Sequence, residues 1–384
     1  MRLLIVCTVS ATVEAFMLPF ADHFRRLGWK VDALANGVDQ NETCRAHFDE
    51  LYGIEWSRRP WDFRNLLRAL NRARAVVTRG GYDIIHVHTP IAAFVLRLAL
   101  KGMENRPAIV YTVHGFHFQP GNSWFGNAVF LNLERLAGRW TDFLVTMNRT
   151  DELAVRRFAI VPAPRSWHMP GIGIDRRHFR PHAVPAEKVA AVRRRFRVDA
   201  DAPLFVMIAE FTARKRHRDA VAAFSRMKTR RAHLIFVGAG PGQRAIESQA
   251  SAAGVSESTH FAGAVPDVRP YILAARAVVL PSSQEGLPRS VMESLCCGIP
   301  VLGSDIRGTR DLLENGGGLL FPVGDVNAFA SLLDWFVENP AKAMEMGSRA
   351  EHSMGRYDIA EIIKLHEELY AKATAKAAVG AACR

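Results

Sequence analysis

The sequence lacks a hydrophobic run long enough to cross a lipid bilayer. Its best apolar stretch, residues 91–100, is only ten residues long and contains Arg97, whereas a spanning helix needs about 20 apolar residues. The first ten residues carry one basic side chain and a β-branched run, which fits a buried strand better than a short signal peptide. We therefore predict an initial strand and no membrane-spanning helix.

Cysteines are few and poorly arranged for a structural role. The sequence has five, none of them in a CxxC pair: Cys7, Cys44, Cys296, Cys297 and Cys383. Their odd number and their spacing exclude a disulfide scaffold and a structural zinc site. They predict a reduced, cytoplasmic protein.

Acidic residues do not balance the basic ones. The 50 Lys and Arg stand against 38 Asp and Glu, a formal net charge of +12 that both halves of the chain share. This surplus leaves nucleic acid, an anionic membrane face and a phosphorylated substrate open as partners. The length of 384 residues, 49% of them hydrophobic, predicts two or three domains with their own cores.

Short aliphatic runs alternate with longer helical patterns along the chain. The runs predicted as strands include residues 3–7, 30–35, 84–88, 109–113, 143–146, 204–208, 234–237, 277–280 and 301–304. Helical segments lie between them, so the pattern predicts an α/β fold with parallel, doubly wound sheets.

A stretch rich in Pro and Gly interrupts this alternation between residues 161 and 185, which is typical of a linker between domains. We predict one Rossmann-like domain over residues 1–170, a linker over 171–200 and a second such domain over 201–355. The C-terminal segment 356–384 has a helical pattern with one apolar face, which we expect to pack back toward the first domain.

The stretch 281–293 follows a predicted strand and opens a helix near Pro288. Ligands of open parallel sheets bind at the carboxyl ends of strands, and free N–H groups in a first helical turn favour an anion such as a diphosphate. Glu285 and Glu293 could each accept hydrogen bonds from sugar or ribose hydroxyls beside it. Spacing alone leaves the alternative open that Glu285 caps the helix and Glu293 is solvated.

Glu285 and Glu293, with Gly298-Ile-Pro300 behind them, resemble the E-x7-E signature of retaining glycosyltransferase family 4. Further motifs extend the resemblance over nearly the whole chain, at residues 16–20, 28–31, 82–90, 111–118, 171–175, 210–217 and 305–311. Members have the GT-B fold, two Rossmann-like domains that face each other across a cleft. The nearest branch contains bacterial enzymes of capsule and exopolysaccharide assembly.

The resemblance implies roles for particular residues. Glu285, His114 and Lys215 are the implied catalytic residues: Glu285 holds donor-sugar hydroxyls, Lys215 neutralises the donor diphosphate, and His114 lies beside the donor sugar. The implied donor-binding residues are Arg214, Lys215, Gly286, Leu287, Pro288, Arg289, Ser290 and Glu293. The second domain is expected to hold the donor and the first domain the acceptor. No cofactor or metal is implied.

The sequence departs from the family pattern at two places. Glu210 stands where relatives usually carry an Arg, so Arg214 is the candidate for the second cation beside Lys215. The first loop, residues 8–13, lacks the glycines that many relatives place against the diphosphate. These departures affect the assignment of residues more than the function.

Other candidate motifs carry less weight. Four histidines, His86, His88, His114 and His117, invite a zinc site, but no carboxylate cluster supports one. The Asp199-Ala-Asp201 string matches a metal-binding motif of another glycosyltransferase fold, and its place before a strand favours a turn. Residues 238–242 resemble a dinucleotide-binding loop, without the acidic partner that NAD requires.

Residues 58–79 contain seven arginines and one acidic residue. Arg64, Arg68 and Arg72 step by four and share a helix face, opposite an apolar side made by Trp61, Phe63, Leu66, Leu67 and Leu70. Such a helix could lie on an anionic membrane surface or simply pack with a solvated basic side. Both interpretations stay open.

The resemblance therefore implies a retaining, metal-independent glycosyltransferase of polysaccharide biosynthesis. The expected donor is a nucleotide-sugar, with UDP as its nucleotide, and the expected acceptor is a glycan or a polyprenyl-diphosphate-linked sugar. Two alternatives remain: a nucleotide-sugar epimerase on the same fold, and a basic nucleic-acid-binding protein, for which no base-recognition motif is visible. We expect a cytoplasmic protein and leave open its attachment to the inner face of the membrane.

Overall fold

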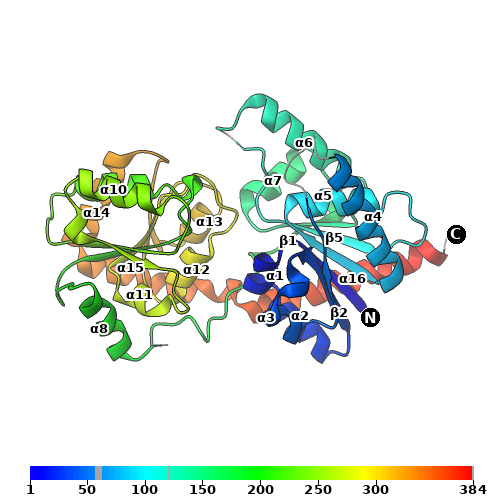
Figure 1. The fold of residues 1–384 in the computed structure, drawn as a ribbon, viewed down its shortest axis with the longest axis horizontal. Coiled ribbons are helices and arrows are strands. Elements are labelled where there is room, and N and C mark those ends of the chain that lie inside the picture. The colour runs from blue at the N-terminus through cyan, green and yellow to red at the C-terminus, as the bar shows by residue number, and fades with distance from the viewer. Residues whose placement is uncertain (57–62, 120, 183, 383–384) are drawn as a thin grey trace. The chain divides into compact units, whose positions relative to one another are not determined.

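The computed structural model describes residues 1–56, 63–119, 121–182 and 184–382 (Figure 1). It contains two compact units, one formed by Met1–Gly173 with Ile359–Arg384 and the other by Ile174–Asp358. Each unit holds one sheet in which all described strand pairs are parallel. Each unit is Rossmann-like, as the sequence predicts for both halves of the chain.

The first unit contains a seven-stranded sheet in the order β3-β2-β1-β4-β5-β6-β7 in its described part. The strands are β1 (Arg2–Val9), β2 (Lys30–Asn36), β3 (Leu51–Gly53), β4 (Ile84–His88), β5 (Ala108–Val113), β6 (Phe143–Thr146) and β7 (Ser166–His168). The helices are α1 (Ser10–Phe16), α2 (Leu18–Arg26), α3 (Glu42–His47), α4 (Phe63–Gly80), α5 (Pro90–Ala99), α6 (Trp124–Gly138), α7 (Arg149–Arg157) and α16 (Ile359–Ala382).

The period of two along β1 divides the first unit's core into two layers. Leu4 and Val6 pack on the side covered by α4, α5 and α7, whereas Leu3, Ile5 and Cys7 pack on the side covered by α1, α2, α3 and α16. Figure 1 shows these helices on opposite sides of the sheet. Because both sides are covered, the strands are continuous hydrophobic runs, which is why the sequence shows them clearly.

Helix α16 completes the first unit from the far end of the chain. Leu369, Tyr370 and Ala373 are buried against the sheet, and the Tyr370 hydroxyl lies 2.6 Å from Nδ1 of His86. The opposite nitrogen of His86 lies 2.7 Å from the Thr112 hydroxyl. His86 is thus fully engaged in joining α16 to β4 and β5, and its role is structural.

A buried ion pair fixes α6 against α5. Arg97 is fully buried, and its Nη2 lies 3.3 Å from Oε2 of Glu134 on α6. Its guanidinium also lies over the ring of Tyr111, 4.2 Å from the centroid, and the Tyr111 hydroxyl donates to Glu134. The one charge inside the apolar stretch 91–100 is therefore neutralised within the fold.

Glu134→Ala should lower the free energy of unfolding of the first unit by about 3 kcal/mol, because it leaves the Arg97 charge buried without its carboxylate. Chemical denaturation followed by circular dichroism measures this change. Glu361→Ala is the matched control, since Glu361 and Lys364 form an exposed pair on α16 of the same unit. Equal stability of the two variants would contradict the role given to the buried pair.

The second unit contains a six-stranded sheet in the order β10-β9-β8-β11-β12-β13 in its described part. The strands are β8 (Leu204–Ile208), β9 (His233–Val237), β10 (Thr259–Gly263), β11 (Ala277–Leu280), β12 (Val301–Ser304) and β13 (Gly318–Phe321). The helices are α8 (Ala186–Arg195), α9 (His217–Ser225), α10 (Gln243–Ala252), α11 (Arg269–Ala274), α12 (Arg289–Cys296), α13 (Thr309–Leu313), α14 (Val326–Glu338) and α15 (Pro340–Ser353).

The segment expected as a linker, residues 171–200, contains helix α8. Val192 of α8 lies in the core of the second unit, and Arg193 donates to the carbonyl oxygens of Ala202 and Ala274. The helical pattern of residues 186–195 is short and highly charged, so the prolines around it dominate the sequence signal.

Each sheet has one position where the strand order reverses. In the first unit β1 lies between β2 and β4, and in the second unit β8 lies between β9 and β11. In parallel sheets, ligands bind beyond the carboxyl ends of the strands at such reversal points. The residues after β1, β4, β8 and β11 are therefore the places to look for a ligand site.

Candidate active site

The reversal point of the second sheet brings Lys215 and Glu285 together. Lys215 lies in the turn after β8 and Glu285 in the loop after β11, and Nζ of Lys215 is 2.6 Å from Oε1 of Glu285. Nη1 of Arg214 lies 3.5 Å from the other oxygen, Oε2. Three predicted site residues that are up to 71 positions apart in the sequence thus meet at one carboxylate.

Two hydrogen bonds join the loop that carries Lys215 to the loop that carries Glu285. The amide of Ser283 donates to the carbonyl oxygen of Arg214 over 2.9 Å, and Nη1 of Arg214 donates to the carbonyl oxygen of Gln284 over 3.1 Å. The Lys215 side chain is 15% exposed and that of Glu285 is 7% exposed. The ion pair is therefore largely shielded from water, and a ligand charge that reaches it would be felt strongly.

The loop after β12 contacts the backbone of the loop that carries Glu285. Nε of the buried Arg307 donates to the carbonyl oxygen of Glu285 over 3.2 Å. Gly308 has φ +65, and a Cβ there would lie 2.0 Å from the carbonyl oxygen of Gly286. Only glycine allows this approach, so the loop 285–288 rests directly on the backbone that follows β12.

Helix α12 carries the second glutamate. It begins at Arg289 after Pro288, with no side-chain cap and no acidic residue in its first turn. Glu293 is buried, and Oε1 lies 2.8 Å from Nε of Arg289. Burial raises the pKa of Glu293 to about 6, and Arg289 partly opposes this rise. Arg289 thus stabilises the ionised form of the Glu293 carboxylate, whose protonation burial favours.

Several buried hydroxyls of the second unit have no hydrogen-bond partner among the described residues. Thr212 follows β8, Ser282 follows β11, Ser304 ends β12 and Thr309 begins α13. A further unpaired hydroxyl, that of Thr259, lies at the start of β10. Buried polar groups are nearly always paired, so the four that follow or end strands are candidates for hydrogen bonds to a polar ligand.

The Gly-rich string after β9 has a packing role. A Cβ at Gly238 would lie 2.2 Å from the carbonyl oxygen of Ala209, and one at Gly240 would lie 2.7 Å from the amide nitrogen of Phe211. These glycines let the loop after β9 press against the segment after β8, which leads to Lys215. They explain the string without a dinucleotide.

In the first unit, histidine and threonine side chains gather at the reversal point of the sheet. Nδ1 of His88, at the end of β4, lies 3.1 Å from Nε2 of His114, which follows β5. The Thr89 hydroxyl lies 2.6 Å from the hydroxyl of Thr8 on β1. Thr89 has φ 69, a strained conformation for a β-branched residue that is typical of functional sites.

The histidines of this cluster are neutral imidazoles. Burial lowers the pKa of His114 to about 4, and it lowers the pKa of His88 and of His86 well below the usual value. A neutral His114 can donate one hydrogen bond and accept another, whereas an imidazolium can only donate. His117 lies apart from this cluster, exposed, with its ring 5.2 Å from that of Phe130.

The structure brings no metal ligands together. Within residues 1–56, 63–119, 121–182 and 184–382, no three His, Cys, Asp or Glu side chains are placed to hold one ion. Asp199 and Asp201 lie in an exposed segment before β8, where Asp201 pairs with Arg231 at 2.7 Å. The four described cysteines, Cys7, Cys44, Cys296 and Cys297, are buried and free.

The basic segment of residues 58–79 is only partly described, because residues 58–62 lie outside the described ranges. Arg64, Arg68 and Arg72 are exposed on α4, and Ala69 and Ala73 face the core. No described helix is both long enough and apolar enough to span a membrane.

Two known families match the two halves of the chain. The model described as "Glycosyltransferase Family 4" matches residues 13–176, and the model described as "Glycosyl transferases group 1" matches residues 189–353. Between them they include Lys215, Glu285 and His114.

Named glycosyltransferases are similar to this chain, one of them over nearly its whole length. EpsD of Bacillus subtilis (strain 168), a protein named as a glycosyltransferase, is 28% identical over 96% of this chain and 96% of its own length. The Escherichia coli UDP-Gal:alpha-D-GlcNAc-diphosphoundecaprenol alpha-1,3-galactosyltransferase is 25% identical over 66% of this chain and 65% of its own.

Solved structures share the fold. Anabaena Alr3699/HepE in complex with UDP has a TM-score of 0.79 and 18% identity, over 97% of this chain and all of its own. Sucrose-phosphate synthase from Thermosynechococcus elongatus has a TM-score of 0.82 and 20% identity, over 98% of this chain and all of its own.

Proposed function

Because this chain belongs to the family 4 and group 1 glycosyltransferases, we propose that it transfers a sugar from a nucleotide-sugar to a glycan or polyprenyl-diphosphate-linked acceptor. The transfer retains the anomeric configuration and needs no metal ion. The observation that carries this proposal is the shielded Lys215–Glu285 pair at the reversal point of the second sheet, beside the uncapped first turn of α12.

We assign the donor to the second unit. Its diphosphate would contact Lys215 and Arg214 and the first turn of α12, formed by Arg289 and Ser290, with the backbone of residues 286–288 alongside. Glu293 would hold the ribose hydroxyls, since its carboxylate is buried four residues into the helix. A UDP nucleotide is supported by the UDP complex of the Anabaena structure.

The proposed chemistry exchanges one C–O bond for another at the anomeric carbon. The bond to the diphosphate oxygen breaks, and the acceptor oxygen attacks from the same face. The acceptor proton passes to the departing diphosphate, so no enzyme nucleophile is required. Lys215 lowers the barrier by stabilising the negative charge that grows on the diphosphate, and Glu285 orients the sugar through its hydroxyls.

His114 is the proposed contribution of the first unit. Its hydrogen bond with His88 fixes the ring, and its low pKa keeps the ring neutral. A neutral imidazole can hydrogen-bond a sugar hydroxyl as donor or acceptor without adding positive charge near an oxocarbenium-like centre. This role suits orientation of the sugar more than proton transfer.

The acceptor assignment rests on the named activity of the Escherichia coli relative. A lipid-linked acceptor would place the reaction at the inner face of the cytoplasmic membrane.

A donor screen followed by product analysis tests the proposal. UDP-sugars should raise the melting temperature of the protein, because a ligand that binds only the folded state stabilises it. With the stabilising donor and a lipid-linked sugar, nuclear magnetic resonance should show a product of the donor's own anomeric configuration. Turnover of the donor without any acceptor would instead indicate an epimerase, and an inverted product would overturn the retaining mechanism.

A further inference from the structure

Helix α6 exposes an unusually apolar face. Its exposed large side chains are Trp124, Phe125, Val129, Phe130, Leu133 and Leu136, of which Trp124 is 81% exposed and Phe125 65%. Phe125, Val129, Leu133 and Leu136 follow one another at spacings of three and four, so they form one continuous stripe along the helix. We name these four residues together with Trp124 the α6 stripe.

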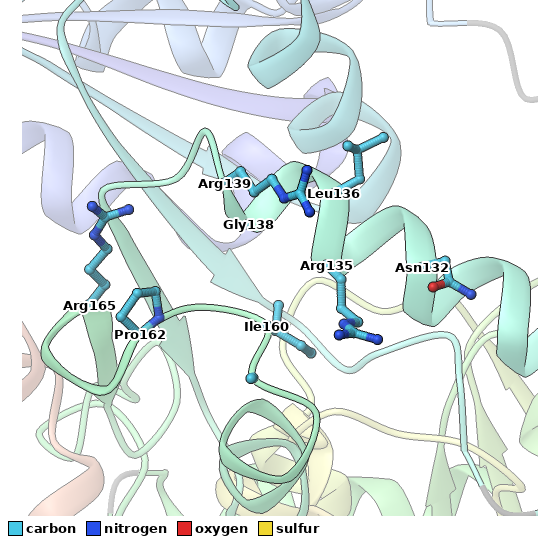
Figure 2. Close-up of a pocket in the computed structure, with 9 residues that line it drawn as sticks. Asn132, Arg135, Leu136, Gly138, Arg139, Ile160, Pro162 and Arg165 are labelled. Atoms are coloured by element: carbon cyan, nitrogen blue, oxygen red, sulfur yellow. The ribbon is translucent and has the colours of Figure 1, made fainter.

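The charges beside the α6 stripe have one sign. Arg135 of α6, Arg139 directly after it and Arg165 of the segment between α7 and β7 line a cavity of about 600 Å³. The other lining residues include Leu136 and Ile160. Figure 2 shows the three arginines around this cavity. None of the three has a side-chain partner among the described residues, and the one carboxylate of α6, Glu134, turns inward to Arg97.

The base of the cavity is rigid. A Cβ at Gly138 would lie 2.0 Å from the carbonyl oxygen of Ile160, so the end of α6 presses directly on the loop that carries Arg165. Arg165 is half-buried, and the buried Arg97–Glu134 pair joins α6, which carries Arg135, to α5.

We propose that the α6 stripe and its three arginines form a membrane-binding surface, in which the aromatic and aliphatic side chains enter the interface of the bilayer and the arginines bind lipid phosphates. Trp and Phe at the start of the helix, aliphatic residues along it and Arg at its flank are the composition of a helix that lies in a bilayer interface. This inference extends the membrane location proposed above, and its test reads lipid binding alone, so it can fail while sugar transfer stands.

Charge complementarity favours an anionic bilayer over a second copy of the chain. In a symmetric contact the same patch meets itself, and the arginines of two copies would face one another without a carboxylate on either patch. An anionic bilayer supplies the missing charge and the apolar layer together. Basic helix α4 packs beside α5, as α6 does, so it is a rival source of lipid binding that must be tested separately.

Sedimentation of the full-length protein with phosphatidylcholine vesicles, with and without phosphatidylglycerol, measures the binding. The combined variant Arg135→Gln, Arg139→Gln, Arg165→Gln should weaken binding to the anionic vesicles by about a hundredfold, given the contribution of each cation near such a surface. Phe125→Ser should weaken it by about tenfold, because a buried phenyl ring is lost from the interface. Met344→Ser, which removes an equally exposed apolar side chain of the second unit, should change nothing.

The α4 variant Arg64→Gln, Arg68→Gln, Arg72→Gln provides the matched charge control. Loss of vesicle binding in this α4 variant, with binding kept in the α6 variants, would overturn the proposal. Vesicle binding as strong as that of the wild type in both the α4 and the α6 variants would overturn it too. Analytical ultracentrifugation tests whether a second copy of the chain binds the stripe instead. If the wild type is a dimer that does not bind vesicles, and Phe125→Ser converts it to a monomer, then the stripe is a dimer contact. Unchanged thermal stability of the variants shows that the effects are not due to unfolding.

Discussion

Lys215→Ala should lower kcat by about a hundred- to a thousandfold and leave KM for the donor within a few fold. The reason is that charge grows on the diphosphate only as the sugar leaves, so a cation beside it stabilises the transition state more than the bound donor. In the resting protein this ammonium group is already paired with Glu285 at 2.6 Å. Steady-state kinetics with saturating acceptor measures both constants.

Two neighbouring arginines serve as controls for this prediction. Arg214 is half-exposed and lies 3.5 Å from Glu285, so Arg214→Ala should cost less than Lys215→Ala. Arg218 lies in the same basic run, is mostly exposed and contacts Asp219, so Arg218→Ala should leave both constants unchanged. A Lys215→Ala enzyme with normal turnover and raised KM would show that Lys215 contributes to binding and not to the transition state.

The fold could be predicted from sequence because the central strands are covered on both sides. Strands β1, β4 and β5 are largely buried and rich in aliphatic, β-branched residues, the pattern of parallel strands covered on both sides. The short edge strands β3 and β7 were not predicted, since three residues such as Leu51–Gly53 carry no readable period. The helix within the segment 171–200 was hidden by the prolines on either side of it.

The site could be predicted only in part. The rule that ligands bind after parallel strands indicated Lys215, Glu285 and Glu293, and family resemblance supplied their roles. Sequence reasoning missed Arg307 as the support beneath Glu285, although it follows a predicted strand and the same rule would have found it. Thr89 could not have been found, because neither its positive φ nor its contact with the Thr8 hydroxyl leaves a signal in the sequence.

The apolar face of α6 shows a different limit. A stripe at spacings of three and four predicts a helix but does not say which side is covered. In the structure α6 packs on the core through Leu131, Ala137 and Glu134, whose carboxylate contacts Arg97 across 37 positions of sequence, and the apolar stripe is exposed.

Glu285→Gln should lower kcat/KM for the UDP-sugar by about a hundredfold while UDP alone binds as well as before or better. The loss follows from weaker hydrogen bonds between the neutral amide and the sugar hydroxyls, because bonds to a charged acceptor are stronger. The equal or tighter binding of UDP follows from the loss of the Lys215–Glu285 ion pair in the variant. In the wild-type protein the diphosphate must share Lys215 with the Glu285 carboxylate, and the amide removes that competition.

Thermal unfolding with and without UDP separates these two effects. Without ligand, Glu285→Gln should melt below the wild type, because Lys215 is left largely buried without a counter-charge; UDP should therefore raise its melting temperature by more than it raises that of the wild type. Glu293→Gln should do the opposite and reduce the shift caused by UDP, since its carboxylate is assigned to the ribose. If Glu285→Gln loses UDP binding in step with its turnover, then Glu285 acts by positioning Lys215 for the diphosphate and not by holding the sugar.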